Sequence, residues 1–140
     1  MDKKIRWGIL GCGNIADKFA ADLQMVSRSK LHAIAAQDFG RANNFAEKHK
    51  AERVYSNYTE LANDPDLDVV YVATTHNFHY EHAALCLAAN KAVLCEKPIC
   101  VNAQEAQKLV ELSRKKHIFL MEAMWTLFLP TVTRLIKDID

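Results

Sequence analysis

Strand-like apolar runs alternate with helical hydrophobic periods along the whole chain, and this alternation restricts the possible folds more than any other feature of the sequence. The runs cover residues 5–10, 31–36, 54–55, 68–73, 92–95 and 118–121. Both faces of these runs are apolar, which is typical of parallel strands buried between two helical layers. The sequence therefore predicts a doubly wound α/β fold with a parallel sheet in the order 3-2-1-4-5-6.

The helical segments between the runs carry signals that mark their ends. Asn90 suits the left-handed position that ends a helix, and Asn102 with Glu105 three residues later forms a capping box. The inner face of the helix after Asn102 is expected to consist of Ala106, Leu109, Val110 and Ser113.

The bulk properties fit one ordinary globular domain. The 140 residues are 50% hydrophobic and 25% charged, with a net charge of +1, so neither nucleic acid nor a membrane is expected as a partner. The first run is too short to span a membrane and lacks a signal-peptide cleavage site, which favours a cytoplasmic location. The four cysteines show no paired spacing and are expected to be reduced thiols: Cys12, Cys86, Cys95 and Cys100.

A glycine-rich turn joins the first run to the first helix. Residues 11–16 read Gly-Cys-Gly-Asn-Ile-Ala, which is the G-x-G-x-x-A pattern of a dinucleotide-binding loop in its expected position. Gly11 is predicted to make the tight turn, Gly13 to let a pyrophosphate approach, and Ala16 to pack the helix on the strand. The candidate pyrophosphate-binding residues are Gly11, Cys12, Gly13, Asn14 and Ile15. The pattern predicts a Rossmann NAD(P)-binding domain, with a ligand-free turn as the alternative.

The end of the second run bears on the choice between NAD and NADP. Enzymes that use NAD usually carry an acidic residue there for the ribose hydroxyls, whereas this chain has Ala36 followed by Gln37. The small Ala36 side chain leaves room for a 2′-phosphate, and Arg41 at the start of the next helix can pair with it. Asp38 is interpreted as the N-cap of that helix. NADP is therefore favoured as the cofactor, with NAD as the alternative.

Two further motifs follow the fourth and fifth runs. Residues 72–79 read Val-Ala-Thr-Thr-His-Asn-Phe-His, and residues 96–98 read Glu-Lys-Pro. Together with Gly-Ile-Leu-Gly-Cys-Gly-Asn-Ile-Ala at 8–16, they give the whole chain a resemblance to the glucose–fructose oxidoreductase/inositol dehydrogenase (Gfo/Idh/MocA) family. Glu-Ala-Met-Trp-Thr at 122–126 narrows this resemblance to the dimeric dihydrodiol dehydrogenases and the NADP-dependent aldose dehydrogenases of xylose type.

Three positions depart from the pattern of these relatives. They commonly have Arg where this chain has Gln37 and Leu127, and Pro where it has Thr75. The Gln37 departure weakens the preference for NADP, and the Leu127 departure removes a candidate contact to substrate or phosphate.

The resemblance implies a two-domain oxidoreductase of which this chain is the cofactor-binding half. Residues 1–125 would form the Rossmann domain, and residues 126–140 would begin the connection to a C-terminal α+β domain that completes the substrate pocket. The implied reaction is hydride transfer between NAD(P) and a CH–OH or C=O group of a polyol, sugar or trans-dihydrodiol. A homo-oligomer is expected for the whole enzyme. The alternative is a free-standing nucleotide-binding module without turnover.

Lys97 is the candidate catalytic residue. It follows the fifth run, at the sheet edge where such folds bind ligands, and a lysine there can exchange a proton with a substrate oxygen. Glu96 is expected to bind the nicotinamide riboside or to hold Lys97, and the resemblance implies a cis Lys97–Pro98 bond. The other candidate cofactor-binding residues are Thr74, Thr75, His76, Asn77, His79 and Trp125.

Two groups of side chains near these motifs have open interpretations. The histidines at 76, 79 and 82 have no carboxylate or thiol at ligand spacing, so no metal is expected, and His79 is expected to cap the next helix or to bond the riboside. Trp125 is expected either in the core or in the wall of the nicotinamide pocket.

An exposed apolar patch is predicted at Phe128, Leu129 and Val132.

Overall fold

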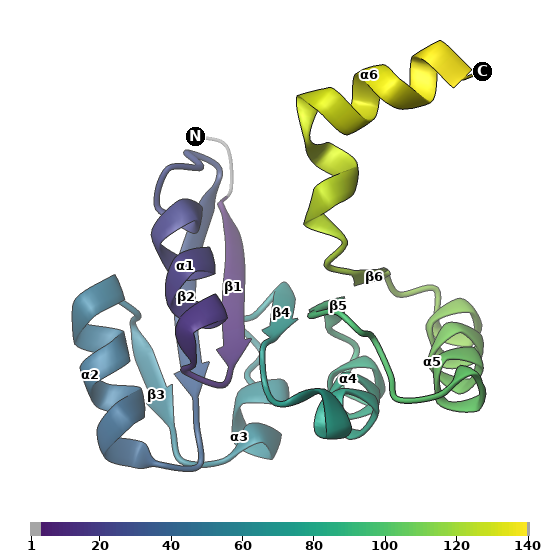
Figure 1. Cartoon of the computed structure of the whole chain (residues 1–140). Helices are drawn as coiled ribbons and strands as arrows, with labels where there is room; N and C mark the ends of the chain where they lie inside the picture. Colours follow the sequence, from purple (N-terminus) through teal and green to yellow (C-terminus); the bar gives the residue numbers. More distant parts are fainter. Residues whose placement is uncertain (1–3, 140) are drawn as a thin grey trace.

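The chain folds around a six-stranded sheet in which every strand pairing is parallel (Figure 1). The computed structural model describes residues 4–139. The strands are β1 (Ile5–Leu10), β2 (Ser29–Ala35), β3 (Arg53–Tyr55), β4 (Val69–Val72), β5 (Ala92–Cys95) and β6 (Leu120–Glu122). Their order is β3-β2-β1-β4-β5-β6, which confirms the predicted topology.

The helices connect these strands and cover both faces of the sheet. They are α1 (Asn14–Leu23), α2 (Phe39–His49), α3 (Tyr58–Ala62), η1 (His76–Phe78), α4 (His79–Ala88), α5 (Ala103–Lys116), η2 (Trp125–Phe128) and α6 (Pro130–Ile139). The 3₁₀ turns η1 and η2 precede α4 and α6. Figure 1 shows η2 and α6 as an arm that leaves the body of the molecule.

Two buried clusters hold the helices to the sheet, one on each face. Strand residues such as Ile9, Ile34 and Tyr71 pack with α1 and α2. Strand residues such as Leu10 and Val72 pack with α3, α4 and α5 on the other face. Successive strand residues point to opposite faces, and burial of each large aliphatic side chain contributes about 1.5–3 kcal/mol. The two-sided burial explains why the strands have no polar face.

The predicted element types are confirmed, and two details differ, one at the start of β6 and one on helix α5. The sixth strand begins at Leu120 rather than Ile118, because the Ile118 N–H donates to the Ser113 carbonyl and completes the exit from α5. Val110 is 38% exposed and does not belong to the inner face of α5, whereas Leu109 is fully buried. The helix N-cap at Asn102 and the left-handed Asn90 lie where the sequence predicts them.

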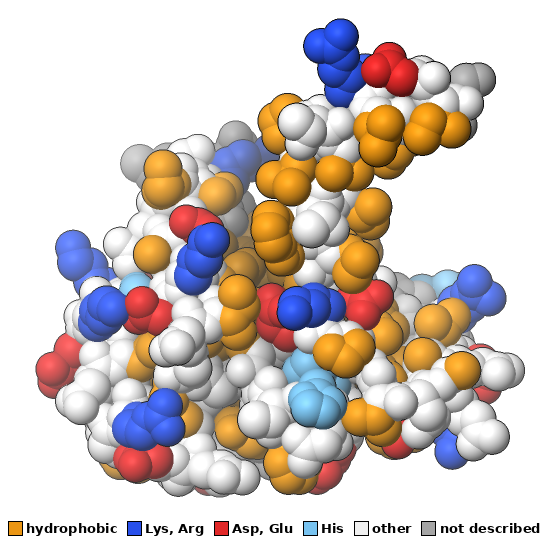
Figure 2. Space-filling view, in the orientation of Figure 1, with side chains coloured by type: hydrophobic (Ala, Val, Ile, Leu, Met, Phe, Trp, Pro, Cys, Tyr) orange, Lys and Arg blue, Asp and Glu red, His pale blue; other side chains and the backbone are white. Residues whose placement is uncertain are grey.

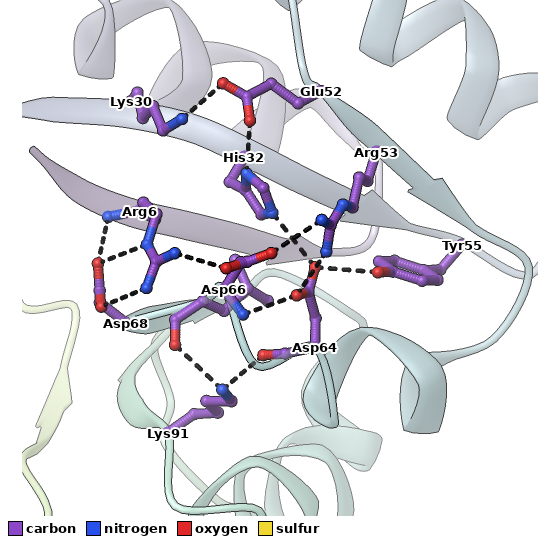
Figure 3. Close-up of polar contacts among 11 residues, drawn as sticks. Arg6, Lys30, His32, Glu52, Arg53, Tyr55, Asp64, Asp66, Asp68 and Lys91 are labelled. Atoms are coloured by element: carbon purple, nitrogen blue, oxygen red, sulfur yellow. Dashed lines mark hydrogen bonds and ion pairs between the residues drawn. The ribbon is translucent and has the colours of Figure 1, made fainter.

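Charged side chains form a network at the amino ends of the strands (Figure 3). Its centre is Asp64, which is 2% exposed. The Asp64 carboxylate accepts from Arg53 Nη1 at 2.8 Å, from the Tyr55 hydroxyl at 2.9 Å and from the Asp66 backbone N–H at 2.8 Å. Arg6 of β1 donates to Asp66 at 2.8 Å. The network therefore ties the loop before β4 to strands β1 and β3.

The network makes stability depend on pH. Burial works to raise the pKa of the Asp64 carboxyl, but its hydrogen bonds from Asp66, Tyr55 and Arg53 outweigh burial and hold this pKa below its usual range. Because the folded-state pKa is lowered, the stabilisation is complete above the unfolded-state value of about 3.9 and is lost as the pH falls through the folded-state value.

Asp64→Asn is therefore expected to lower the free energy of unfolding at pH 7 by about 2 kcal/mol, or the Tm by roughly 7 °C. The asparagine keeps the shape but not the charge that Arg53 neutralises. Thermal melts followed by circular dichroism at pH 7 and pH 3 measure the effect, which should shrink at the acidic pH. Glu111→Gln, which changes an exposed carboxylate on α5, is the control. An equal loss at both pH values would contradict the charge-based explanation.

All four cysteines are free thiols, as the sequence predicts, and burial raises the pKa of the Cys86 thiol to about 12.

Within residues 4–139, no helix combines the length and apolar character that crossing a membrane requires.

Candidate dinucleotide site

The turn after β1 has the backbone geometry that the glycine pattern predicts. Gly11 has a φ of +93°, and a Cβ at this position would lie 2.8 Å from the Ala73 carbonyl oxygen, so a side chain would strain both the backbone and the neighbouring strand end. At Gly13, in contrast, a Cβ would meet no atom within 4 Å. The open space beside Gly13 is the cradle that a pyrophosphate needs.

Helix α1 begins directly at this open space. Gly13 is its N-cap and supplies no side-chain hydrogen bond, so the first N–H groups of the helix, including those of Asn14 and Ile15, have no partner within it. Such an end attracts anions through its free N–H groups and the helix dipole. Ala16 is fully buried and lets α1 pack closely on the sheet. The residues present therefore fit a bound pyrophosphate.

A hollow of about 370 Å³ lies on the β2 side of the glycine turn. Ala36 and Gln37 line it where β2 ends, and Arg41 lines it from α2. The Arg41 guanidinium reaches the Cys12 carbonyl at 3.5 Å, while Asp38 accepts from the Arg41 backbone N–H at 3.0 Å as the N-cap of α2. The predicted N-cap is confirmed, and among the residues 4–139 that the structure describes, Arg41 and Asp38 are the charged side chains that line this hollow.

Aromatic side chains form the far wall of this hollow. The His82 ring lies between Tyr58 and Phe78, at centroid distances of 4.5 and 5.7 Å. Its Nδ1 is 2.9 Å from the Thr74 hydroxyl, and burial lowers the pKa of His82. A neutral ring at the end of an aromatic wall is a surface on which a flat heterocycle can stack.

A larger groove of about 550 Å³ lies between α1 and η2. Ile15 and Phe19 of α1 face Trp125 and Phe128 across it. Trp125 is 58% exposed, so it belongs to a wall and not to the core. Figure 2 shows hydrophobic side chains gathered along η2 and α6 beside this groove, where Phe128 and Leu129 are exposed as predicted. Val132 is only half-exposed.

The floor of the groove carries a buried carboxylate, Glu96, at the end of β5. One Glu96 oxygen accepts from the Tyr71 hydroxyl of β4, and the other accepts from the Lys97 backbone N–H at 3.1 Å. Burial and the neighbouring Glu96 raise the pKa of Tyr71 above its usual range, so its hydroxyl stays protonated. Lys97 itself is exposed, and its peptide bond to Pro98 is cis, as the resemblance implies.

The buried His79 ring connects the Glu-Lys-Pro turn to the loop after β4. Its ring is 1% exposed, with Nδ1 2.7 Å from the Pro98 carbonyl oxygen and Nε2 3.0 Å from the Thr74 carbonyl oxygen. Both ring nitrogens therefore lie within hydrogen-bond distance of a backbone carbonyl oxygen. His79 does not cap α4, contrary to one of the two expectations, because the N-cap of this helix is Phe78 and the His79 ring joins the loops after β4 and β5.

The structure brings most of the predicted site residues to the carboxyl edge of the sheet. Cys12, Thr74 and Thr75 line the hollow on the β2 side, and Glu96 and Trp125 line the groove on the other side. His76 and Asn77 are exposed on η1 and line neither of them. Sequence reasoning did not identify four residues that shape the site, which are Phe19, Tyr58, Tyr71 and His82.

Within residues 4–139, one group of side chains has metal-ligand geometry, and it lies in the amino-end network rather than at residues 76, 79 and 82. It consists of His32, Asp64 and Asp66. Arg53 donates to both aspartates at 2.8 Å, and Arg6 donates to Asp66. The arginines already neutralise these carboxylates, so the group is better described as an ion-pair network.

Strands β2 and β3 are added on one side of β1, and strands β4, β5 and β6 on the other. The glycine turn lies at this switch point of the sheet, with a hollow on either side. Fold and site together define a dinucleotide-binding Rossmann domain. The profile of an oxidoreductase family with an NAD-binding Rossmann fold matches residues 5–124, and the chain belongs to this Gfo/Idh/MocA family.

Relatives with similar sequences include dihydrodiol dehydrogenases. A trans-1,2-dihydrobenzene-1,2-diol dehydrogenase from Macaca fuscata fuscata is 49% identical over 128 residues, which are 90% of this chain and 38% of that protein. The Bos taurus protein of the same name is 47% identical over 133 residues, with coverages of 94% and 40%. The chain thus spans about two fifths of the length of these relatives.

Solved structures of similar fold include two oxidoreductases. An NAD binding oxidoreductase from Klebsiella pneumoniae has a TM-score of 0.92 at 31% identity, covering 97% of this chain and 38% of that one. A 3-ketoreductase from Actinomadura kijaniata, in complex with NADP and TDP-benzene, has a TM-score of 0.91 at 31% identity, with coverages of 98% and 42%.

Proposed function

We propose that the chain is the cofactor-binding part of an NAD(P)-dependent dehydrogenase. The observation that carries this proposal is the open space at Gly13, with one hollow on the β2 side and another beside α1, because a dinucleotide lying over the glycine turn would reach both hollows. The pyrophosphate would lie on the first turn of α1, the adenosine against Arg41 and the His82 wall, and the nicotinamide in the groove beside Glu96. Lys97 would exchange a proton with the substrate oxygen.

The substrate side of the reaction is assigned to a second domain. Residues 1–125 would form the cofactor domain and residues 126–140 the start of the connection, in keeping with the match of the family profile to residues 5–124. The apolar face of η2 and α6 would pack on that domain, which would also mediate a homodimer. A trans-dihydrodiol is the favoured substrate because of the names of the relatives; other polyols and sugars are alternatives. A cytoplasmic location is part of the same proposal.

The direct test is a calorimetric titration of the chain with NADP⁺ and NAD⁺. We expect NADP⁺ to bind more tightly, because Ala36 leaves space at the end of β2 and Arg41 can pair with a 2′-phosphate. Ala36→Asp is expected to reverse the preference by about tenfold or more, since a carboxylate would accept from ribose hydroxyls and repel the phosphate. Ala36→Asn is the control for size. Tighter binding of NAD⁺ by the unmodified chain would contradict the assignment of NADP.

A further inference from the structure

Two carboxylates line the groove between α1 and η2, and they differ in their surroundings. Glu96 is 8% exposed at the end of β5, whereas Asp22 is exposed near the end of α1. Asp22 is eight residues along the helix from Asn14, or about 12 Å away from the glycine turn. Glu96 is therefore the negative charge at the end of the groove that adjoins the dinucleotide path.

Glu96 accepts one hydrogen bond at each of its two carboxylate oxygens. The Tyr71 hydroxyl donates to one oxygen and the Lys97 backbone N–H to the other. The raised pKa of Tyr71 keeps its hydroxyl a donor at physiological pH. Neither partner is a cation, so neither one neutralises the charge.

The position of this charge is fixed by a column of aromatic rings. Tyr71 stacks on Phe19, with ring centroids 4.0 Å apart and an interplanar angle of 24°. Phe19 in turn packs against Trp7 in an edge-to-face arrangement, with ring centroids 5.3 Å apart and an interplanar angle of 61°. Tyr71 is almost completely buried in this column, and its packing holds the ring with the hydroxyl directed at Glu96.

We propose that Glu96, held by Tyr71, makes the site favour the oxidised over the reduced nicotinamide. This inference depends on the proposed function, which places the nicotinamide in this groove. The oxidised ring carries a positive charge and the reduced ring is neutral, so a fixed negative charge nearby stabilises only the oxidised form. At the effective dielectric of a protein surface, unit charges about 5 Å apart interact strongly enough to change relative affinity by tenfold or more.

The preference has a consequence for the direction of the reaction. Hydride transfer from a substrate C–H to the ring breaks that bond, forms a C–H bond at the ring and removes its positive charge, while the substrate hydroxyl releases its proton as the C=O forms. A site that binds the oxidised cofactor more tightly than the reduced cofactor lowers the reduction potential of the bound NAD(P)⁺/NAD(P)H couple. Glu96 thereby makes the bound, reduced cofactor a stronger hydride donor, which favours carbonyl reduction.

The test measures a ratio of dissociation constants on the 140-residue chain. NADP⁺ and NADPH are titrated into the unmodified chain and into three variants: Glu96→Gln, Tyr71→Phe and Asp22→Asn. The ratio of the Kd for NADPH to the Kd for NADP⁺ is expected to fall by about tenfold in Glu96→Gln, because only the charge is removed. A smaller fall is expected in Tyr71→Phe, where the carboxylate loses its fixed position. Asp22→Asn should stay within about twofold of the unmodified ratio.

The ratio separates this inference from the proposed function and from folding defects. Both ligands are titrated into one preparation, so an unfolded fraction changes the measured stoichiometry and not the ratio. If both forms bind and Glu96→Gln leaves the ratio unchanged, the role of Glu96 is refuted while the dinucleotide site stands. If neither form binds the unmodified chain, the proposed function is refuted and this inference with it.

Discussion

Gly13→Val is expected to weaken dinucleotide binding by at least about a hundredfold while the fold is retained. The two branches of valine would occupy the open space beside Gly13, where a Cβ meets no protein atom within 4 Å. That space is the proposed position of the pyrophosphate, so the side chain would exclude the ligand without straining the protein. A lost pyrophosphate contact removes several charge-assisted hydrogen bonds, each contributing about 1.5–3 kcal/mol.

The measurement is a calorimetric titration with NADP⁺, accompanied by a thermal melt. The Tm of Gly13→Val should stay within a few degrees of the unmodified chain. Gly11→Ala is the matched contrast, because its Cβ would lie 2.8 Å from the Ala73 carbonyl oxygen at a φ of +93°; it should lower the Tm clearly. Unchanged affinity in a folded Gly13→Val variant would show that the glycine turn does not bind the pyrophosphate.

Lys97→Ala is expected to lower kcat by roughly 10²–10⁴-fold, the usual contribution of a positioned acid or base. The assay needs an enzyme in which this chain is followed by a substrate-binding domain. Dinucleotide affinity should change by only a few-fold, since the Lys97 side chain is exposed and its backbone N–H, which holds Glu96, remains. The chain by itself should bind dinucleotide without dehydrogenating a polyol, sugar or trans-dihydrodiol.

Lys97→Arg distinguishes proton transfer from charge. Arginine keeps the positive charge but does not lose its proton near neutral pH, so turnover should remain low while cofactor affinity is kept. Full turnover in Lys97→Arg would assign Lys97 a purely electrostatic role. Turnover by the 140-residue chain alone would show that these residues contain a complete active site, and the two-domain proposal would be wrong.

The features that could be predicted from the sequence are those that depend on neighbouring residues in the chain. A glycine with positive φ, an N-cap at Asp38 or Asn102 and a buried parallel strand each leave a local pattern. The strand order then follows from the handedness of the crossovers. For this reason the glycine turn and the Glu-Lys-Pro turn could be placed at one sheet edge before the structure was known.

The features that could not be predicted depend on register between strands. Tyr71 and Glu96 are 25 residues apart, and their contact requires β4 and β5 to pair as Val69 with Ala92 and Val72 with Cys95. The contacts of the His79 ring with two carbonyl oxygens likewise depend on where the loops after β4 and β5 meet. Burial of a single histidine or tyrosine leaves no periodic signal, because a period needs several residues.

The place of β1 in the sheet has a consequence for how the chain folds. β1 precedes both of its partners in the sequence; it pairs on one side with β2 and on the other with β4, so that Trp7 lies opposite Val69. One of its hydrogen-bonding edges therefore stays unpaired until residues far along the chain have been made. Parallel pairings of such long sequence separation close slowly, and an open apolar strand edge can meanwhile pair with another molecule. A chaperone that shields β1 during synthesis should thus raise the yield of this chain more than it raises that of a helical domain of similar length.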